Sequence, residues 1–176
     1  GASVQFSTVL GDDPMKEFVL EQLAEAGIDC QAQIDPTRVT TQKNAFIADD
    51  YRLLKVDKVD NRPISSNIIN RLKETISASH ADAFVFSDFR HGIFNPLIIP
   101  ELAGALPEGA FRVADSQVAS RWGNILDFSG FDLITPNERE ARFALGDQDS
   151  VIRPLALDLY KRAKCKTLVL NLGEQG

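Results

Sequence analysis

The pattern of hydrophobic and polar positions in the C-terminal two thirds of the chain is built on four short apolar runs. They cover residues 83–87, 111–114, 131–135 and 167–170. Helical patterns stand between them, near 96–106 and near 151–163, where apolar residues recur every four positions. The pattern at 117–128 is weak and predicts a loop with a helical turn. Near-continuous apolar strands separated by helices indicate a parallel sheet with both faces covered, so this region predicts an α/β fold.

The first eighty residues predict one strand and two helices around an extended segment. The strand covers residues 5–10, and the helices run over about 14–26 and from Ser65 or Ser66 to about residue 77. Serine is a favoured N-cap residue, and Gly27 is suited to end the first helix in a left-handed conformation.

The extended segment covers residues 31–59. Asp49-Asp50 forms a turn between two strand-like runs within it, which predicts a meander or hairpin inserted into the α/β chain. The exposed edges of such a hairpin commonly need covering, which favours self-association. No linker long enough to separate two domains is present, so we expect a single domain over residues 1–176.

Composition excludes several classes of function. Hydrophobic residues make up 44% of the chain and charged residues 25%, the balance of a soluble globular protein. The net charge is −6 without a Lys/Arg run, so we expect no nucleic-acid partner. No apolar run is long enough to span a membrane and no signal peptide opens the chain, which favours a cytoplasmic location. Two cysteines and two histidines are too few for a disulfide framework or a structural zinc site.

Each apolar run ends in a polar or glycine-bearing corner. The corner residues are Asp88, Asp115, Asn137 and Asn171, with Gly173 close behind the last. In a parallel sheet these corners gather along one edge, where open α/β sheets bind ligands. Ordinary turn chemistry is the alternative explanation, because Asp, Asn and Gly are favoured in turns for backbone reasons.

The corner after the third run is the most informative. Pro136 fixes the backbone there, and Asn137 and Glu140 stand three residues apart on the first turn of a helix. Both side chains can therefore point to one side and bind a ligand. The same spacing is also a variant of the capping box, which would make the two residues a local helix cap.

Several segments, in order, resemble a ribokinase-family (PfkB-type) carbohydrate kinase, most of all the branch that phosphorylates heptose 7-phosphate. These segments are residues 1–13, 40–43, 52–57, 86–92, 114–117, 135–140 and 170–176. The likeness spans essentially the whole chain. It implies an incomplete ribokinase-like three-layer parallel sheet, with helices on both faces and a small β lid at 31–59. It further implies ATP-dependent phosphoryl transfer to a hydroxyl of a sugar or sugar phosphate, with Mg²⁺, and a homodimer formed through the lid.

The resemblance also implies roles for individual residues. Those near the nucleotide are Asn171, Gly173, Gly176 and Asp115. Those that organise Mg²⁺ are Asn137 and Glu140, and those on the substrate side are Lys43, Arg52 and Asp88. For Lys43 and Arg52 a solvated strand face is the alternative.

The sequence also departs from the family pattern. His91 stands where the heptose kinases carry Lys, Ser116-Gln117 replace Pro-Lys, and Asn171 replaces Thr, which puts the heptose phosphate in question. The family's Gly-x-Gly-Asp segment, which supplies an anion hole and the catalytic base, does not occur in these residues. We therefore name no catalytic residue and expect a central part of a kinase, inactive alone. A non-catalytic nucleotide-binding, sugar-binding or assembly module is the alternative, and an unrelated doubly wound binding protein is a third.

Overall fold

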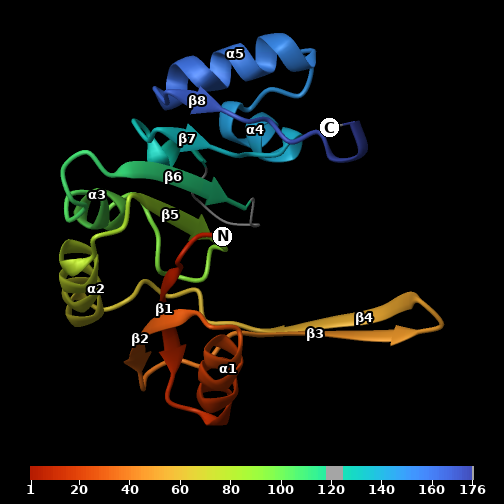
Figure 1. The fold of residues 1–176 in the computed structure, drawn as a ribbon. Helices are drawn as coiled ribbons and strands as arrows, with labels where there is room; N and C mark the ends of the chain where they lie inside the picture. The colour runs from red at the N-terminus through yellow and green to blue at the C-terminus, as the bar shows by residue number, and fades with distance from the viewer. Residues whose placement is uncertain (118–124, 176) are drawn as a thin grey trace. The chain divides into compact units, whose positions relative to one another are not determined.

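The computed structural model describes residues 1–117 and 125–175 (Figure 1). The chain divides into two compact units, residues 1–75 and residues 76–176. The predicted single domain over 1–176 stays a prediction.

The first unit opens with a βαβ element. Strand β1 (Gln5–Gly11) pairs in parallel with β2 (Asp29–Asp35), and helix α1 (Pro14–Glu25) connects them. Asp13 caps α1, because its carboxylate accepts a hydrogen bond from the Met15 amide at 3.1 Å. Gly27 follows the helix at φ 69°, a conformation that favours glycine. The predicted strand and helix are confirmed, and β1 lengthens by one residue.

A long antiparallel ribbon follows. It consists of β3 (Gln42–Ala48) and β4 (Tyr51–Lys58), joined at Asp49-Asp50, whose φ values of 45° and 64° make the tight turn. The expected hairpin at 31–59 was too long at its start, because β2 pairs in parallel with β1 and is not part of the ribbon. An extended pattern shows that a segment is a strand but does not show which strand it pairs with.

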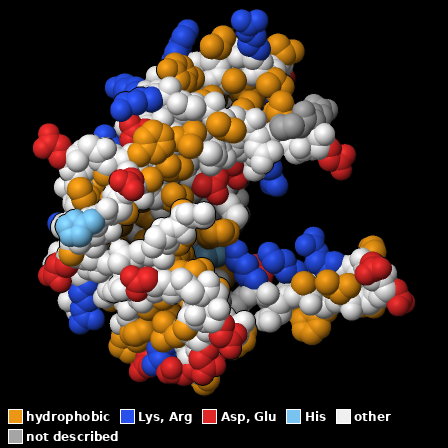
Figure 2. All heavy atoms as spheres, viewed as in Figure 1, with side chains coloured by type: hydrophobic (Ala, Val, Ile, Leu, Met, Phe, Trp, Pro, Cys, Tyr) orange, Lys and Arg blue, Asp and Glu red, His pale blue; other side chains and the backbone are white. Residues whose placement is uncertain are grey.

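The ribbon has two chemically different faces. Cross-strand partners share a face, and the pairs Asn44–Val56, Phe46–Leu54 and Ala48–Tyr51 form a mainly apolar one. The pairs Lys43–Asp57, Ala45–Lys55 and Ile47–Arg52 form the other. Figure 2 shows basic side chains gathered along one side of the ribbon and hydrophobic ones along the other. The apolar side chains are exposed, Phe46 to 54% and Tyr51 to 71%.

The division of the chain into two units falls after Thr75, within helix α2 (Ser66–Ala78). The Ser65 hydroxyl accepts a hydrogen bond from the Ile68 amide at 3.4 Å, as expected for a serine at the start of a helix. One face of the helix is apolar, and Ile68, Ile69 and Leu72 are buried.

The second unit contains a four-stranded parallel sheet in the order β5-β6-β7-β8 (Figure 1). The strands are β5 (Ala83–Asp88), β6 (Phe111–Ser116), β7 (Leu133–Ile134) and β8 (Thr167–Leu168). All four predicted runs are strands and every neighbouring pair is parallel, which confirms the α/β fold class. The last two strands are shorter than their apolar runs, because only two residues of each pair in the ladder.

The helices of this unit are α3 (Ile98–Ala103), η1 (Ile125–Phe128), α4 (Glu138–Leu145), α5 (Ile152–Ala163) and the short η2 (Gly173–Gln175). The expected helix at 96–106 is shorter, because the Asn95 side chain accepts from the Ile98 amide at 2.9 Å and fixes its start. The four-residue apolar repeat of α5 is fully buried at Leu155, Leu159 and Ala163.

The core of this unit includes a cluster of four phenylalanines: Phe86, Phe94, Phe128 and Phe131. Their ring centroids lie 5.2 to 6.3 Å apart, mostly edge to face, which is a favourable arrangement for aromatic rings. Across the described residues, no helix combines the length and apolar character needed to cross a membrane.

Candidate functional site

The carboxyl ends of β5 to β8 bring the predicted corner residues to one edge of the sheet. Asp88 stands opposite Ser116 in the register of β5 and β6, and Ser87 stands opposite Asp115. Beyond β7 and β8, Asn137 and Asn171 form a further parallel bridge. Since neighbouring residues on a strand point to opposite faces, Asp115 and Ser116 serve different surroundings.

Asp88 lies in a buried cluster around Arg90. The Asp88 side chain is 1% exposed and the Arg90 side chain 6%. The Arg90 amide donates to Asp88 Oδ1 at 2.8 Å, and Arg90 Nη1 lies 3.1 Å from Asp88 Oδ2. The Ser116 hydroxyl donates to Asp88 Oδ2 at 3.3 Å. Burial raises the pKa of Asp88, against the lowering effect of the Arg90 amide and guanidinium.

These contacts bear on the predicted substrate role of Asp88. Both carboxylate oxygens already accept hydrogen bonds from neighbouring protein groups. Because the Asp88 side chain is only 1% exposed, a sugar hydroxyl could reach it only if the surrounding groups moved apart. The role of Asp88 in substrate binding stays a prediction, with this condition attached.

Asp115 faces a different neighbour. The Thr135 hydroxyl donates to Asp115 Oδ1 at 3.1 Å, which ties the end of β6 to the residue after β7. Thr135 is itself anchored, because its amide donates to the Ala114 carbonyl at 3.2 Å. In the sequence, Thr135 is only the last residue of an apolar run, and its side-chain contact with Asp115 became visible only with the register of the strands.

Asn137 and Glu140 form a complete capping box at the start of α4. The Asn137 side chain accepts from the Glu140 amide at 2.9 Å, and the Glu140 carboxylate accepts from the Asn137 amide at 2.8 Å through Oε2. Both predicted interpretations of the spacing are compatible with this geometry. Glu140 is 8% exposed, and among the residues that the structure describes no hydrogen bond is made by its Oε1.

The loop after β8 is locked to the start of α4. The Asn171 amide donates to the Pro136 carbonyl at 2.9 Å, and the Glu138 amide donates to the Asn171 carbonyl at 3.2 Å. The Asn171 side chain accepts from the Gly173 amide at 3.0 Å, and Gly173 has a φ of 63°. Gly176, also predicted to lie near the nucleotide, is outside the described residues.

An open hollow of about 380 Å³ adjoins this junction. It is lined by Asn137, Glu138, Arg139, Arg142, Asn171, Leu172 and Gly173. Three of the predicted site residues therefore border one concave surface. Arg139 and Arg142 add positive charge to its wall, a feature that the sequence motifs did not single out.

Lys43 and Arg52 lie in the first unit, on the same face of the ribbon. Lys55 shares that face and lies 3.0 Å from Asp57. Strict alternation would place Lys55 on the opposite face from Arg52, three residues away. Only the register shift between Phe46 and Ile47 brings them to one face, so no signal for Lys55 was available in the sequence.

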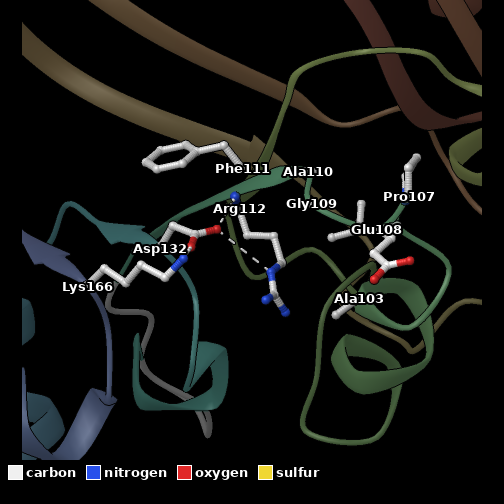
Figure 3. Close-up of a pocket in the computed structure, with 10 residues that line it drawn as sticks. Ala103, Pro107, Glu108, Gly109, Ala110, Phe111, Arg112, Asp132 and Lys166 are labelled. Carbon is white, nitrogen blue, oxygen red and sulfur yellow. Dashed lines mark hydrogen bonds and ion pairs between the residues drawn. The ribbon is translucent and has the colours of Figure 1, made fainter.

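The amino ends of the same strands carry a second buried carboxylate (Figure 3). Asp132 accepts from the Arg112 amide at 2.7 Å and lies 2.7 Å from Lys166 Nζ. The hydrogen bond from Lys166 and that from the Arg112 amide lower the pKa of Asp132. A hollow of about 330 Å³ adjoins it, with Glu108 and the Arg112 side chain on its wall. Nothing in the sequence motifs pointed to this cluster.

A parallel α/β sheet with polar groups at its carboxyl edge is the arrangement in which open α/β folds bind their ligands. Comparison with known proteins identifies the family. The family model described as pfkB family carbohydrate kinase matches residues 1–176, and the chain belongs to this family.

Curated relatives include the bifunctional protein HldE of several bacteria. The Pelobacter propionicus protein is 28% identical over 183 aligned residues, covering 100% of this chain and 37% of the relative. The Caulobacter vibrioides protein is 32% identical over 123 residues, covering 70% of this chain and 25% of the relative. The match thus spans 37% of one relative and 25% of the other, well under half of either.

Solved structures confirm the ribokinase-like fold. Ribokinase from Giardia lamblia matches with a TM-score of 0.75 at 17% identity, over 98% of this chain and 53% of that one. The tetrameric inhibited form of Escherichia coli phosphofructokinase-2 matches with a TM-score of 0.77 at 17% identity, over 99% and 58%.

Proposed function

We propose that the intact protein transfers the γ-phosphoryl group of ATP to a hydroxyl of a sugar or sugar phosphate. The observation that carries this proposal is the family match along all 176 residues, joined to a carboxyl edge that gathers Asp115, Asn137, Glu140 and Asn171. Phosphoryl transfer depends on positioning and on charge stabilisation, and both are supplied by groups at such an edge.

ATP and Mg²⁺ are the proposed cofactors. Glu140 offers one oxygen that makes no hydrogen bond within the described residues, and Asn137 offers an amide beside it. Mg²⁺ prefers oxygen ligands and keeps several waters, so one carboxylate plus nucleotide phosphates suits it. Asn171, Gly173, Gly176 and Asp115 are the proposed nucleotide neighbours.

The acceptor is proposed to be a sugar or sugar phosphate, with Lys43, Arg52 and Asp88 on the substrate side. The HldE relatives and the motif order favour a phosphorylated sugar such as a heptose phosphate. His91 and Ser116-Gln117, which replace the lysines of the heptose kinases, are the reason to test other acceptors as well.

The catalytic base is proposed to come from outside these residues, since no Gly-x-Gly-Asp occurs among them. We therefore expect residues 1–176 alone to bind nucleotide without turnover. We further propose a cytoplasmic homodimer joined through the ribbon, because the ribbon exposes Phe46, Leu54 and Val56 on one face.

The test is an assay of ADP release by the intact protein, expressed from the whole coding sequence, with Mg²⁺, ATP and a panel of sugars and sugar phosphates. We expect release that depends on one class of acceptor. Nucleotide binding without turnover against every acceptor would support the alternative, a non-catalytic binding or assembly module. Light scattering in the same buffer checks the dimer, and a monomer at assay concentration would contradict it.

A further inference from the structure

Arg90 is the internal cation of the carboxyl edge. It follows β5, and its guanidinium contacts the last residues of β5 and β6, Asp88 and Ser116. Only 6% of the side chain is exposed. Nη2 donates to the Ser116 hydroxyl at 2.7 Å, and Nε donates to the Gln117 carbonyl at 3.3 Å. Nη1 lies between two carboxylates, 3.1 Å from Asp88 and 3.5 Å from Asp127 in η1. Each nitrogen of the guanidinium therefore has a defined partner.

The backbone at Arg90 is held in an uncommon conformation. Its φ is 61°, in the left-handed region that favours glycine and is sparsely used by other residues. Such conformations persist where surrounding contacts over-determine them. Here the Arg90 amide donates to Asp88 Oδ1 at 2.8 Å, and Arg90 Nη1 lies 3.1 Å from Asp88 Oδ2. The main chain and the side chain of Arg90 therefore both contact the Asp88 carboxylate.

The contacts of Arg90 flank Asp115 in the sequence. Ser116 and Gln117 follow directly after Asp115, and Ser116 stands opposite Asp88 in the register of the two strands. Asp115 points to the other face of β6, where Thr135 binds its Oδ1 at 3.1 Å. The strand end is thus fixed on one face by Arg90 and on the other by Thr135, with the Asp115 carboxylate held between these two attachments.

We propose that Arg90 is a positioning residue for nucleotide binding, which it serves by fixing the end of β6 and so the direction of the Asp115 carboxylate. The proposal rests on the proposed function, in which Asp115 borders the nucleotide. It gives Asp88 a specific task, to anchor Arg90. The planar fork of arginine suits this task, because one guanidinium serves four acceptors at fixed angles, which a lysine ammonium cannot do.

The experiment measures the affinity of the intact protein for the ATP analogue AMP-PNP with Mg²⁺ by calorimetry. Arg90→Gln and the gentler Ser116→Ala are each made in the native protein and in Asp115→Asn. Arg112→Gln is the matched control, since Arg112 lies on the same strand, and its backbone amide and guanidinium both contact a buried aspartate, Asp132, at the opposite end. Thermal unfolding is recorded for every variant.

We expect Arg90→Gln to weaken analogue binding about tenfold, and Ser116→Ala about threefold, whereas Arg112→Gln leaves binding unchanged although it lowers stability. In the Asp115→Asn protein the Arg90 and Ser116 changes should have no further effect on binding. That loss of effect distinguishes positioning from a general structural role, which would persist in both backgrounds.

Two results would overturn the proposal for Arg90, and a third would contradict the proposed function instead. Equal effects of Arg90→Gln with and without Asp115 would overturn the proposal, and so would binding by Arg90→Gln at native affinity. If Arg90→Gln does not fold, Ser116→Ala carries the test by itself. Failure of the unaltered protein to bind the analogue at all would instead contradict the proposed function, so the two failures are distinguishable.

Discussion

Two buried aspartates at opposite ends of one sheet show how the same residue type serves different purposes. Asp88, at the carboxyl end of β5, and Asp132, just before β7, are each 4% exposed or less at the side chain. Both accept a backbone amide and both lie beside an arginine. Their pKa values nevertheless shift in opposite directions, upward for Asp88 and downward for Asp132.

The difference comes from what surrounds each carboxylate. Burial is the largest influence on the pKa of Asp88 and raises it, and the nearby carboxylate of Asp127 raises it further. Asp132 accepts hydrogen bonds from Lys166 Nζ and from the Arg112 amide, each at 2.7 Å, and these outweigh its burial and favour its charge. The surroundings at the amino edge therefore favour a charged carboxylate, whereas burial at the carboxyl edge disfavours it, which is an electrostatic cost. Such electrostatic cost is typical of functional sites.

The largest expected effect is on turnover, which should depend on the carboxyl edge of the sheet and not on the amino edge. Glu140→Gln keeps the acceptor for the Asn137 amide but removes the charge proposed to organise Mg²⁺, so turnover of the intact protein should fall on the order of 100-fold. Asp132→Asn, at the amino edge, should leave turnover near the native value. Steady-state kinetics with saturating ATP checks both, and a large loss in Asp132→Asn would mean that the edges are not functionally distinct.

Asp132→Asn should instead lower stability by about 2 kcal/mol, because a buried carboxylate loses charge-assisted hydrogen bonds. Urea unfolding at neutral pH measures the change. A variant as stable as the native protein would show that these hydrogen bonds contribute nothing.

How far these features were accessible from sequence differs between the two edges. The corners at Asp115, Asn137 and Asn171 were predictable because turn residues follow apolar runs and parallel strands align their ends. The Asp132 cluster was not, since Arg112, Asp132 and Lys166 meet only through register and carry no motif. Arg90 lies within the segment 86–92 that resembles the family, but its burial depends on Ser116 and Asp127 from other segments.

The same limit applies to the fold. The strands β5 to β8 and the helix α5 followed from periodicity, because buried strands and a buried helix stripe leave strong patterns. The start of the ribbon did not, because β2 has the extended pattern of its neighbours and only its pairing with β1 separates it.

A smaller expected effect is the pH dependence of stability, which should differ between Asp88 and Asp132. The contribution of Asp132 to stability is present above the ordinary pKa of 3.8 and is lost as the pH falls below it. The contribution of Asp88 runs the other way: it is full below 3.8 and is lost as the pH rises toward the raised pKa.

Unfolding free energies of Asp88→Asn, Asp132→Asn and the native protein, measured from about pH 3 to about pH 7, test this. The deficit of Asp132→Asn should grow as the pH rises through 3.8, and that of Asp88→Asn should shrink above it. Parallel curves would contradict the opposite pKa directions.

The smallest expected effect is that of Lys166→Ala. Because the lysine side chain is 79% exposed, its ion pair with Asp132 should contribute no more than about 1 kcal/mol. Urea unfolding at low and high salt checks this, with a smaller difference expected at high salt. A loss of stability as large as that of Asp132→Asn would mean that the ion pair with Lys166 accounts for the whole contribution of Asp132.

The most direct test of the central claim is a crystal structure of the intact protein with Mg²⁺ and AMP-PNP. The account predicts the phosphates at the carboxyl edge, with the ion or its waters beside Glu140 and Asn137 and the loop at Asn171–Gly173 against the nucleotide. A nucleotide bound at the Asp132 edge, or phosphates remote from Glu140, would contradict it.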